Sequence, residues 1–580
     1  MFSYINKMEK TLSENDRKML SDIYAPTVVA TPDADPYYNL CITRDGAIRA
    51  YGHYMKKHVF DTDCRACYIE STDCGLSWKR YLVDDKNAMG ASTYVPYLDK
   101  YVKLKNTQDG TFALIGHSPD DAEPEMYKIA DPGKFREFRL PYVLSLQNRI
   151  ICIVHENRLD EHPTCFYNAV LSSVDGKEWN ITHLPAAPYA EKKWPHKGVR
   201  WQQNNRESTV TELSDGTLLL ISRTSTDFHY TCTSTDGGLT WTHPEKSIFH
   251  STGTMPVLKK LSDGRIMFFW CNTKLLPEVH DADGIWEDFF TNRDANHCAI
   301  SEDDGKTWRG YREMVLNPIR CAADFRSNGG PECDRDKSVH QFEALQLPMN
   351  KILVVCGQHY SCRRIIIFDI NWLYETSRHE DFIHGLANLS TQSYVKSISG
   401  GFPGQTPETA LSYVGHCACN RVSGALLLPS PENDKHEVLH IASSADTRLL
   451  NPLCGAVWNF PVIKKGKLVL TAHLPENGKG LRISLLDHWM NPCDNTVEYY
   501  ADFSIHLRPD MHPENELFTD FVFEFDCERN TVTLTAGDYL RIEKTLSGAH
   551  PNGLCYLHMQ SANESDYVGA MVKAIDVTAI

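Results

Sequence analysis

The sequence predicts an all-β protein in which a β-propeller precedes a β-sandwich. One observation is a short turn pattern, SxDxGx[ST]W, which occurs three times in full and once in shortened form. A second is the spacing of these turns, because the steps between the last three match one four-stranded sheet with its loops. A third is the change after about residue 380, where strand-like segments continue without the turn pattern. Together they favour small sheets stacked radially, followed by a second all-β unit.

The recurring turn has a chemistry suited to joining two strands. Its Asp and Ser side chains can bond turn amides, its Gly takes a backbone angle closed to other residues, and its Trp packs beside the neighbouring strand. The copies are 71–78 (STDCGLSW), 173–179 (SVDGKEW), 234–241 (STDGGLTW) and 301–308 (SEDDGKTW). The step from Trp78 to Trp179 covers about one and a half to two sheets, so we expect one sheet between them to lack the turn.

The N-terminal segment and the cysteines indicate the compartment. Residues 1–25 are charged throughout and lack the apolar core of an export signal, so we expect a short helical extension and a cytoplasmic protein. The 19 cysteines are then expected to be reduced thiols that pack as small hydrophobic residues. The pairs Cys64/Cys67 and Cys417/Cys419 could be halves of a zinc site, but metal spacing usually repeats in a second clear pair with histidines nearby. We therefore predict no metal and no cofactor.

The charge of the chain limits its partners. The formal net charge of -16 argues against nucleic acid and against anionic membrane surfaces. No apolar run approaches the roughly 20 residues of a membrane span. An acidic small ligand remains compatible with this charge, because a local cluster of arginines can override the overall sign.

Strand-like segments separated by Gly, Asp and Pro extend over residues 26–378, which we predict to be the propeller. Examples are 37–51, 149–155, 218–223, 265–271 and 351–357. A short helix is expected at 372–377, and a polar linker rich in Ser and Gly follows at 379–404. Residues 405–580 contain short apolar or alternating segments between turns, a pattern that predicts a β-sandwich.

The repeated turn resembles the Asp box of the sialidase-like family, and a second segment adds to the resemblance. Residues 205–213 read NRESTVTEL, similar to the family pattern NESxVxEL, and a DG hairpin follows. The resemblance covers roughly residues 30–375 and implies a six-bladed propeller with its site at the mouth of the central channel. It also implies that the appended sandwich is lectin-like, with sugar binding and structural support both open. The Asp box occurs in non-enzymes too, so function rests on other residues.

The resemblance assigns roles to several residues near these motifs. Glu207 matches the glutamate that accepts the proton of a nucleophilic tyrosine, which replaces the usual carboxylate because the substrate carries a carboxylate at the reacting carbon. Arg223 and Arg293 match two of the three arginines that bind this carboxylate through their bidentate fork. Arg206, in the same motif as Glu207, is a further candidate for substrate binding.

The acid/base aspartate of the family lies on a loop shortly before the first Asp box. The corresponding loop here, 60–65, reads FDTDCR and offers Asp61 and Asp63. We favour Asp61 slightly over Asp63. Capping of the loop is the alternative role for either residue, since Asp is common in turns.

Two family positions are not matched by this chain. Where the first arginine belongs, residues 38–41 read YNLC, and the possible substitutes are Arg44, Arg49 and Arg65. Where the tyrosine belongs, residues 339–345 read VHQFEAL, which places Phe342 at the nucleophile position. His340, two positions earlier and on the same strand face, or Tyr360 can then take part in catalysis or substrate binding. An ordinary hydrogen-bonded or core histidine is an equally open interpretation of His340.

These residues favour an exo-acting glycoside hydrolase that removes a terminal acidic sugar, sialic acid or a related ketodeoxy or uronic acid. A buried glutamate and two converging arginines are unfavourable to desolvate without a ligand or partner, which argues for a working site. A non-catalytic module that binds an acidic glycan is the first alternative, supported by the missing tyrosine and arginine. A polysaccharide lyase with a histidine base is the second. In each case the expected partner is an acidic carbohydrate.

Overall fold

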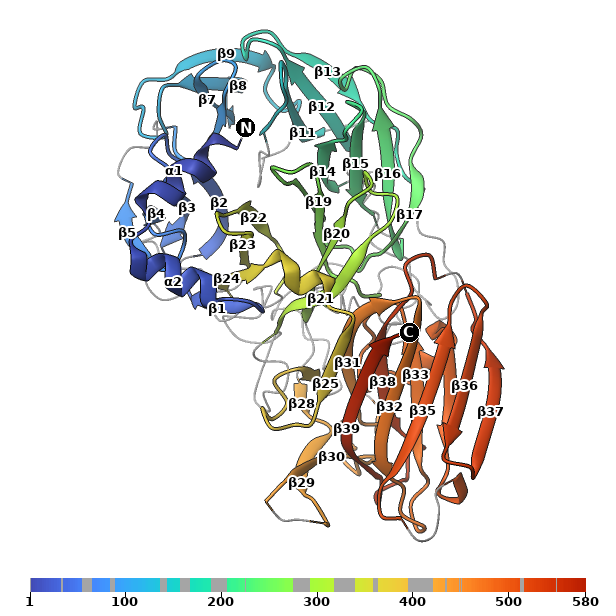
Figure 1. Ribbon diagram of the computed structural model, residues 1–580. Coiled ribbons are helices and arrows are strands. Elements are labelled where there is room, and N and C mark those ends of the chain that lie inside the picture. Colours follow the sequence, from blue (N-terminus) through green and yellow to red (C-terminus); the bar gives the residue numbers. More distant parts are fainter. Residues whose placement is uncertain are drawn as a thin grey trace.

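The computed structural model describes residues 2–32, 35–54, 65–83, 89–135, 143–156, 167–188, 206–224, 226–274, 293–317, 339–357, 363–394, 421–432, 435–447, 449, 451–511, 516–548 and 550–580. These residues form almost only β-strands, which confirms the all-β prediction. Figure 1 shows a ring of small sheets with two larger sheets packed beside it.

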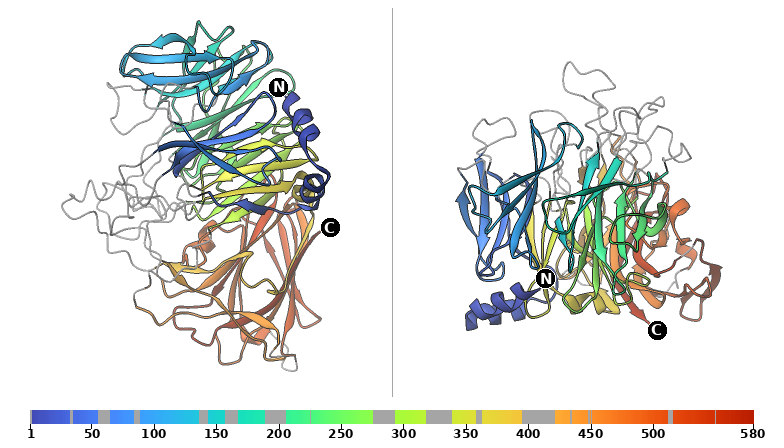
Figure 2. Two further views of the ribbon diagram at one scale, coloured as in Figure 1. Left: turned by 90° about the vertical axis from the view of Figure 1, so that its left-hand side faces the viewer. Right: turned by 90° about the horizontal axis from the view of Figure 1, so that it is seen from above.

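Two helices precede the strands, within the residues for which a helical extension was predicted. They are α1 (Ser3–Thr11) and α2 (Glu14–Asp22). Ser13 and Asp16 form a capping box at the start of α2, in which each side chain accepts the backbone N–H of the other. Met8 and Leu20 pack against the ring, and Figure 2 shows both helices on one side of it. No helix within the described residues is long and apolar enough to cross a membrane.

Five four-stranded antiparallel sheets follow in chain order within the described residues. The first two contain β2 (Asp35–Ile42), β3 (Ile48–Tyr54), β4 (Arg65–Ser71) and β5 (Lys79–Leu82), then β6 (Thr93–Val95), β7 (Lys100–Thr107), β8 (Gly110–Gly116) and β9 (Glu125–Ala130). The third contains β10 (Val143–Ser145), β11 (Ile150–Glu156), β12 (Tyr167–Ser173) and β13 (Asn180–His183). The last two contain β14 (Arg206–Glu212), β15 (Leu218–Arg223), β16 (Phe228–Ser234) and β17 (Glu245–His250), then β18 (Val257–Lys260), β19 (Ile266–Trp270), β20 (Ala295–Ser301) and β21 (Arg309–Leu316).

A sixth sheet joins the two ends of this series. It contains β22 (Glu343–Gln346), β23 (Lys351–Cys356) and β24 (Arg364–Asp369), and β1 (Thr27–Ala30) adds to the outer edge of β24. Neighbouring sheets contact one another along their first strands or the strand beside them, and β22 in turn contacts β2. The ring is therefore closed by a strand from the start of the chain that completes a sheet from the end of the series.

The four repeated turns have the same hydrogen bonds and the same place in their sheets. In the first, Ser71 Oγ accepts the N–H of Gly75 at 2.7 Å, and Trp78 Nε1 donates to the Gly75 carbonyl at 2.9 Å. The three other turns repeat both bonds. Each turn joins the third strand of a sheet to the fourth. The β6–β9 sheet lacks the turn, as expected for the sheet between Trp78 and Trp179, and in the sixth sheet β1 comes from elsewhere in the chain.

The C-terminal residues form two packed antiparallel sheets and a short ribbon. The larger sheet contains β25 (Ser377–Glu380), β29 (Leu426–Pro429), β30 (Glu437–Ile441), β32 (Lys465–His473), β35 (Thr519–Asp526), β36 (Thr531–Ala536), β37 (Leu540–Thr545) and β39 (Ala570–Ala579). The smaller contains β26 (Leu389–Ser390), β31 (Gly455–Ile463), β33 (Leu481–Leu486), β34 (Phe503–Leu507) and β38 (Leu554–Ser561), and the ribbon pairs β27 (Gln392–Tyr394) with β28 (Arg421–Ser423). Short helical turns are η1 (Ile370–Tyr374), α4 (Val497–Tyr500) and η2 (Pro509–Met511).

The boundary between the two parts differs from the predicted linker at 379–404. The strand β25 pairs with β39, so the C-terminal sheets begin before residue 379. Two further strands of the same region, β26 and β27, pair with β31 and β28. The polar composition that suggested a linker belongs to short paired strands as far as residue 394, and residues 395–404 lie outside the described part of the chain. The expected helix at 372–377 is the single turn η1.

The two parts share a continuous apolar interface. Aromatic side chains of the β18–β21 sheet pack in one cluster with those of the C-terminal sheets, among them Trp270, Trp308, Tyr311, Trp489 and Tyr556. Buried hydrogen bonds cross the same interface: the Asn459 side chain donates to the Tyr311 carbonyl at 2.9 Å and accepts the N–H of Glu313 at 3.1 Å. The ring and the C-terminal sheets are thus packed like one core, not joined only by a tether.

Replacing Tyr556 by phenylalanine is expected to lower the free energy of unfolding by about 2–3 kcal/mol. The Tyr556 hydroxyl lies between His297 Nε2 and Glu313 Oε1, to which it donates at 2.7 Å, and all three belong to this buried interface. Without the hydroxyl, the buried imidazole of His297 and the half-buried carboxylate of Glu313 each lose a partner. Denaturant unfolding of both proteins measures the effect. Tyr567→Phe is the control, because Tyr567 is exposed and its change should stay within about 0.5 kcal/mol; equal effects of the two changes would contradict this role of Tyr556.

Buried neutral histidines should make the protein less stable in acid. Burial lowers the pKa of His297 to about 3, and it also lowers the pKa of His229 to about 3. The unfolded chain binds a proton at each site below about pH 6.5, while the folded chain does not, so stability falls as pH drops through this window. Each histidine adds a slope of about 1.4 kcal/mol per pH unit. Unfolding of wild type and His297→Gln at pH 7, 6 and 5 tests this, and equal slopes would contradict it.

The twelve described cysteines form no disulfide with one another. Eleven of them are buried. Of the two cysteine pairs noted in the sequence, only Cys67 lies within the described residues, where it packs in the apolar core of the first sheet.

Candidate functional site

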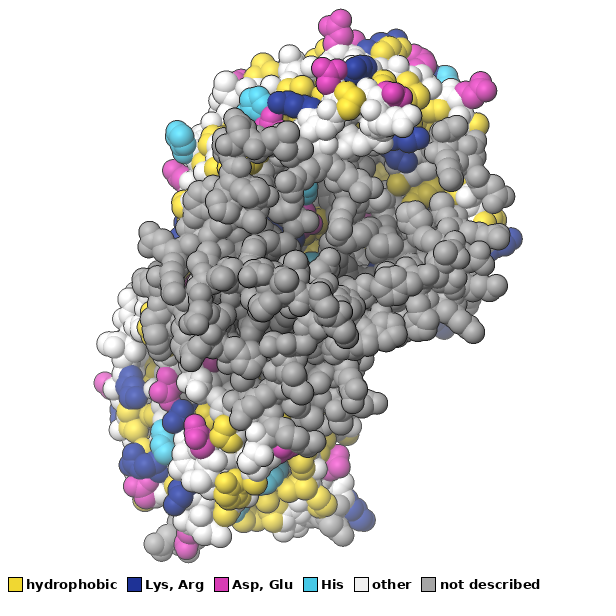
Figure 3. All heavy atoms as spheres, turned by 180° about the vertical axis from the view of Figure 1, so that it is seen from behind, with side chains coloured by type: hydrophobic (Ala, Val, Ile, Leu, Met, Phe, Trp, Pro, Cys, Tyr) yellow, Lys and Arg dark blue, Asp and Glu magenta, His cyan; other side chains and the backbone are white. Residues whose placement is uncertain are grey.

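Four of the predicted site residues lie at one edge of three neighbouring sheets. In each sheet the first and third strands run in one direction and the second strand runs in the opposite direction. The first residues of strands one and three therefore lie at the same edge as the last residue of strand two. Glu207 lies at the start of β14 and Arg223 ends β15. Arg293 precedes β20, and His340 precedes β22. The helix α1 contacts the opposite edge, where Lys7 donates to the Arg44 carbonyl at 2.7 Å. Figure 3 looks on to the face away from the helices, and acidic and histidine side chains are visible in its hollow.

A β-bulge turns Glu207 toward Arg223. Arg206 pairs with Arg223 and Thr209 with Ile221, so the strand β14 carries one extra residue between these pairs. Glu207 lies in this bulge and has a φ of 49°. This left-handed conformation costs a non-glycine residue on the order of 1–3 kcal/mol. Its carboxylate forms a short ion pair with Arg223 Nη1, with both side chains less than a tenth exposed. The predicted catalytic glutamate is thus one of the residues with a strained backbone.

Side chains from neighbouring strands hold the bulge in place. The backbone N–H of Glu207 donates to His155 Nε2 at 3.0 Å, which makes His155 the Nδ1–H tautomer at the end of β11. The Ser208 hydroxyl accepts from the Asn168 side chain at 2.5 Å and donates to the Ser222 hydroxyl at 2.9 Å. Sequence reasoning did not identify His155. Its only signal was a polar residue at the end of an apolar strand, which is too common to be diagnostic.

Arg293 and His340 form a second buried pair. Arg293 Nη1 lies 3.2 Å from His340 Nε2, and Nη2 donates to the Gly253 carbonyl at 2.8 Å. Both side chains are about 1% exposed. Because the guanidinium can only donate, His340 presents the lone pair of Nε2 and is uncharged in this contact. Gly253 lies beside the Thr224 carbonyl, the residue after Arg223, so the two pairs are close neighbours.

A further buried arginine was not predicted from the sequence. Arg363 is 1% exposed and immediately precedes β24, the third strand of the sixth sheet. Arg293 occupies nearly the same place before β20, the third strand of the fifth sheet. Both arginines come just before an apolar strand in the sequence. This shared pattern could have identified Arg363.

The remaining predicted residues are not part of this described arrangement. Asp61, Asp63 and Tyr360 lie outside the described residues, as does the side chain of Arg206. Phe342, at the expected tyrosine position, is 2% exposed and packs in the apolar core of the fifth and sixth sheets. It is therefore a core residue.

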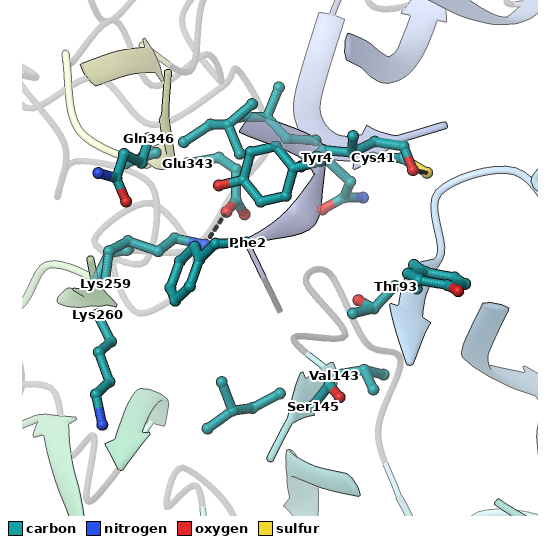
Figure 4. A pocket seen from close by; sticks show the side chains of 18 of the residues that line it. Phe2, Tyr4, Cys41, Thr93, Val143, Ser145, Lys259, Lys260, Glu343 and Gln346 are labelled. Atoms are coloured by element: carbon teal, nitrogen blue, oxygen red, sulfur yellow. Dashed lines mark hydrogen bonds and ion pairs between the residues drawn. The ribbon is translucent and has the colours of Figure 1, made fainter. Parts of the chain in front are cut away.

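A cavity of about 290 Å³ lies nearer the opposite end of the ring. The first strands of all six sheets line it, together with Phe2, Tyr4 and Lys7 of the N-terminal segment (Figure 4). Lys259 Nζ and Glu343 Oε1 form an ion pair of 2.6 Å at its wall. None of Glu207, Arg223, Arg293 or His340 lines this cavity, so it is separate from the candidate site.

Comparisons with known proteins find solved structures of low similarity, sialidases among them. No family model matches the chain, and no curated protein matches it. A Trypanosoma rangeli sialidase is 12% identical, with 94% of this chain and 92% of that one covered at a TM-score of 0.34. The NanB sialidase from Streptococcus pneumoniae is 12% identical over 62% of this chain and 73% of that one, with a TM-score of 0.34. An exo-β-1,3-galactanase from Phanerochaete chrysosporium is 8% identical over 93% and 95%, with a TM-score of 0.27. These TM-scores are low, so the role of each side chain is inferred from its own contacts.

Proposed function

We propose that the six sheets of the ring are the blades of a sialidase-like propeller and that the protein hydrolyses a terminal acidic sugar from a glycan. The observation that supports this most is the collection of buried charge at one edge, Arg223, Arg293 and Arg363 with Glu207. Arginines are almost never fully buried unless they are paired. A substrate carboxylate at this edge would meet several guanidinium groups, whose positive charge attracts an anion.

The arginines are suited to bind the carboxylate of the sugar. Arg223 uses Nη1 for Glu207, while its buried Nε has no hydrogen-bond partner within the described residues. The guanidinium therefore keeps donor capacity directed away from Glu207. In this proposal Arg363 replaces the arginine that is missing from the first blade. Arg363 precedes the third strand of the sixth blade, as Arg293 precedes the third strand of the fifth blade. A planar carboxylate bridging such forks gains charge-assisted hydrogen bonds at defined angles.

Glu207 acts as the base of the nucleophile in this proposal. Its carboxylate, held by Arg223, accepts the phenolic proton. Tyr360 is our candidate nucleophile, because it falls between β23 and β24, on the connection that joins two strand ends at the same edge. Its phenolate oxygen attacks the anomeric carbon and the bond to the leaving oxygen breaks, while Asp61 or Asp63 donates a proton to that oxygen. Water then displaces the tyrosine.

His340 is better suited to position Arg293 than to act as a base. Its Nε2 lone pair already faces the guanidinium of Arg293. This geometry speaks against the lyase alternative, which needs a free histidine base. The binding-module alternative is favoured by one observation, the burial of Phe342 at the tyrosine position. The binding-module alternative requires that no other residue acts as the nucleophile in place of the missing tyrosine.

A panel of substrates separates the three functions. Sialyl, ketodeoxynonulosonyl, ketodeoxyoctulosonyl and uronyl glycosides are incubated with the protein, and products are followed by chromatography and by ultraviolet absorbance. Release of a saturated free acidic sugar from one of them supports the hydrolase. An unsaturated, absorbing product indicates a lyase. Binding of one glycoside without any product leaves the binding module.

A further inference from the structure

A second cluster of polar side chains lies where the ring meets the C-terminal sheets. His250 ends β17, and Asp487 and His488 directly follow β33, so the cluster takes residues from both parts of the chain. His250 Nε2 lies 3.0 Å from each oxygen of the Asp487 carboxylate, and His488 Nδ1 lies 2.6 Å from one of them. One nitrogen or oxygen atom from each of the three residues lies within 4.8 Å of the others.

Both histidines of the cluster are buried, the Asp487 side chain is 19% exposed, and the backbone of the cluster is held by hydrogen bonds. The side chains of His250 and His488 are 8% and 1% exposed. The carbonyl of Asp487 accepts from the Asn272 side chain at 2.9 Å, and the N–H of Trp489 donates to the Asn272 carbonyl at 2.8 Å. The segment 487–489 is therefore tied to the end of β19. The two buried histidines are held where water competes poorly for them, and Asp487 is half-buried beside them.

The two imidazoles each use only one nitrogen toward the protein. His250 Nδ1 and His488 Nε2 are buried and have no hydrogen-bond partner within the described residues. Both rings instead turn their other nitrogen to the same carboxylate, with their centroids 4.2 Å apart. The two histidines come from different parts of the chain and contact the same carboxylate. A cation bound between the three side chains would explain this arrangement.

We propose that His250, Asp487 and His488 bind one divalent ion, Zn²⁺ or a similar first-row metal, which links the ring to the C-terminal sheets. Two imidazole nitrogens and a carboxylate are a ligand set that Zn²⁺ accepts, with a water or another group as the fourth ligand. Bonds of about 2.0–2.2 Å in a tetrahedral site place ligand atoms about 3.3 Å apart. The contact of 3.0 Å between His250 and the carboxylate then opens by about 0.3 Å, and the contact of 2.6 Å between His488 and the carboxylate opens by about 0.7 Å. The protons of the two neutral rings then reside on His250 Nδ1 and His488 Nε2. This site is distinct from the candidate glycosidase site and does not depend on its function.

Metal analysis of the full-length protein without a polyhistidine tag tests the proposal. Protein stripped with EDTA is titrated with Zn²⁺, and bound metal is measured after desalting. The expected result is about one equivalent of Zn²⁺ and a rise in Tm of several degrees, because the ion binds only the folded chain. Titration with Co²⁺ gives a second readout, since a tetrahedral nitrogen and oxygen site produces visible absorption bands.

Variants identify the ligands. His250→Gln and Asp487→Asn should each weaken Zn²⁺ binding at least tenfold and remove the rise in Tm. His558→Gln is the matched control, because His558 is an equally buried histidine of the C-terminal sheets that bonds the Asn491 carbonyl at 2.9 Å. It should bind the metal like the wild type. Wild-type protein that binds neither ion at micromolar concentration would overturn the proposal, as would full binding by both His250→Gln and Asp487→Asn.

Discussion

Replacement of Glu207 by glutamine is expected to lower kcat by about 10²-fold or more while the protein stays folded. Glutamine is nearly the same size and can still bond Arg223, but it cannot accept the phenolic proton. The bulge at Glu207 and its bond to His155 do not depend on the side-chain charge, so the local backbone should be retained. The measurement is the rate of sugar release from the substrate that the panel identifies, at saturating concentration, for both proteins.

A matched substitution shows whether the loss is specific to the site. Glu380 is also buried and charged, and it bonds the backbone N–H of Phe382 at 2.9 Å in the C-terminal part of the chain. Glu380→Gln should therefore leave kcat unchanged within about twofold, since it is remote from the proposed chemistry. If Glu207→Gln retained wild-type kcat, Glu207 would have no role as a base.

Replacement of Arg223 by lysine is expected to raise KM for the acidic sugar by roughly 10- to 100-fold. A lysine keeps one positive charge, but it loses the planar fork that can bond Glu207 and a substrate carboxylate together. The effect should fall mainly on KM, because the carboxylate is bound in both the ground state and the transition state. A neutral analogue of the same sugar, lacking the carboxylate, should bind equally well to both proteins.

Arg312 offers a control of the same kind. Its side chain is as buried as that of Arg223 and forms an ion pair of 2.6 Å with Glu375, on the side of the fifth sheet that faces η1. Arg312→Lys should cost stability without a change in KM. An unchanged KM in Arg223→Lys, or an equal rise in Arg312→Lys, would remove Arg223 from the substrate site.

The repeated turns could be predicted from the sequence because their chemistry is local. Ser71, Gly75 and Trp78 bond one another within one hairpin, so the pattern alone specifies the turn and the strands on either side. Glu207 and Arg223 were identified through the resemblance of their surroundings to a family pattern, and both belong to one hairpin. Sequence spacing thus predicted the regular part of each sheet and the residues within it.

Other features depend on contacts between distant segments. The bond of Glu207 to His155 joins two sheets, and β1 completes a sheet whose other strands lie more than 300 residues later. The pairing of β25 with β39 likewise joins residues far apart, which is why the polar segment before residue 394 looked like a linker. Short local patterns do not encode such contacts. The shared core around Trp270 and Tyr556 was missed for this reason as well.

A crystal structure with a bound transition-state analogue of sialic acid tests the central claim most directly. We expect the carboxylate of the analogue to lie within hydrogen-bond distance of Arg223, Arg293 and Arg363, with its anomeric carbon near Glu207 and a tyrosine hydroxyl. The same soak with Arg223→Lys should show weaker occupancy at the same place. An analogue seated in the cavity beside Phe2 and Tyr4, or bound only to the C-terminal sheets, would contradict the proposed site.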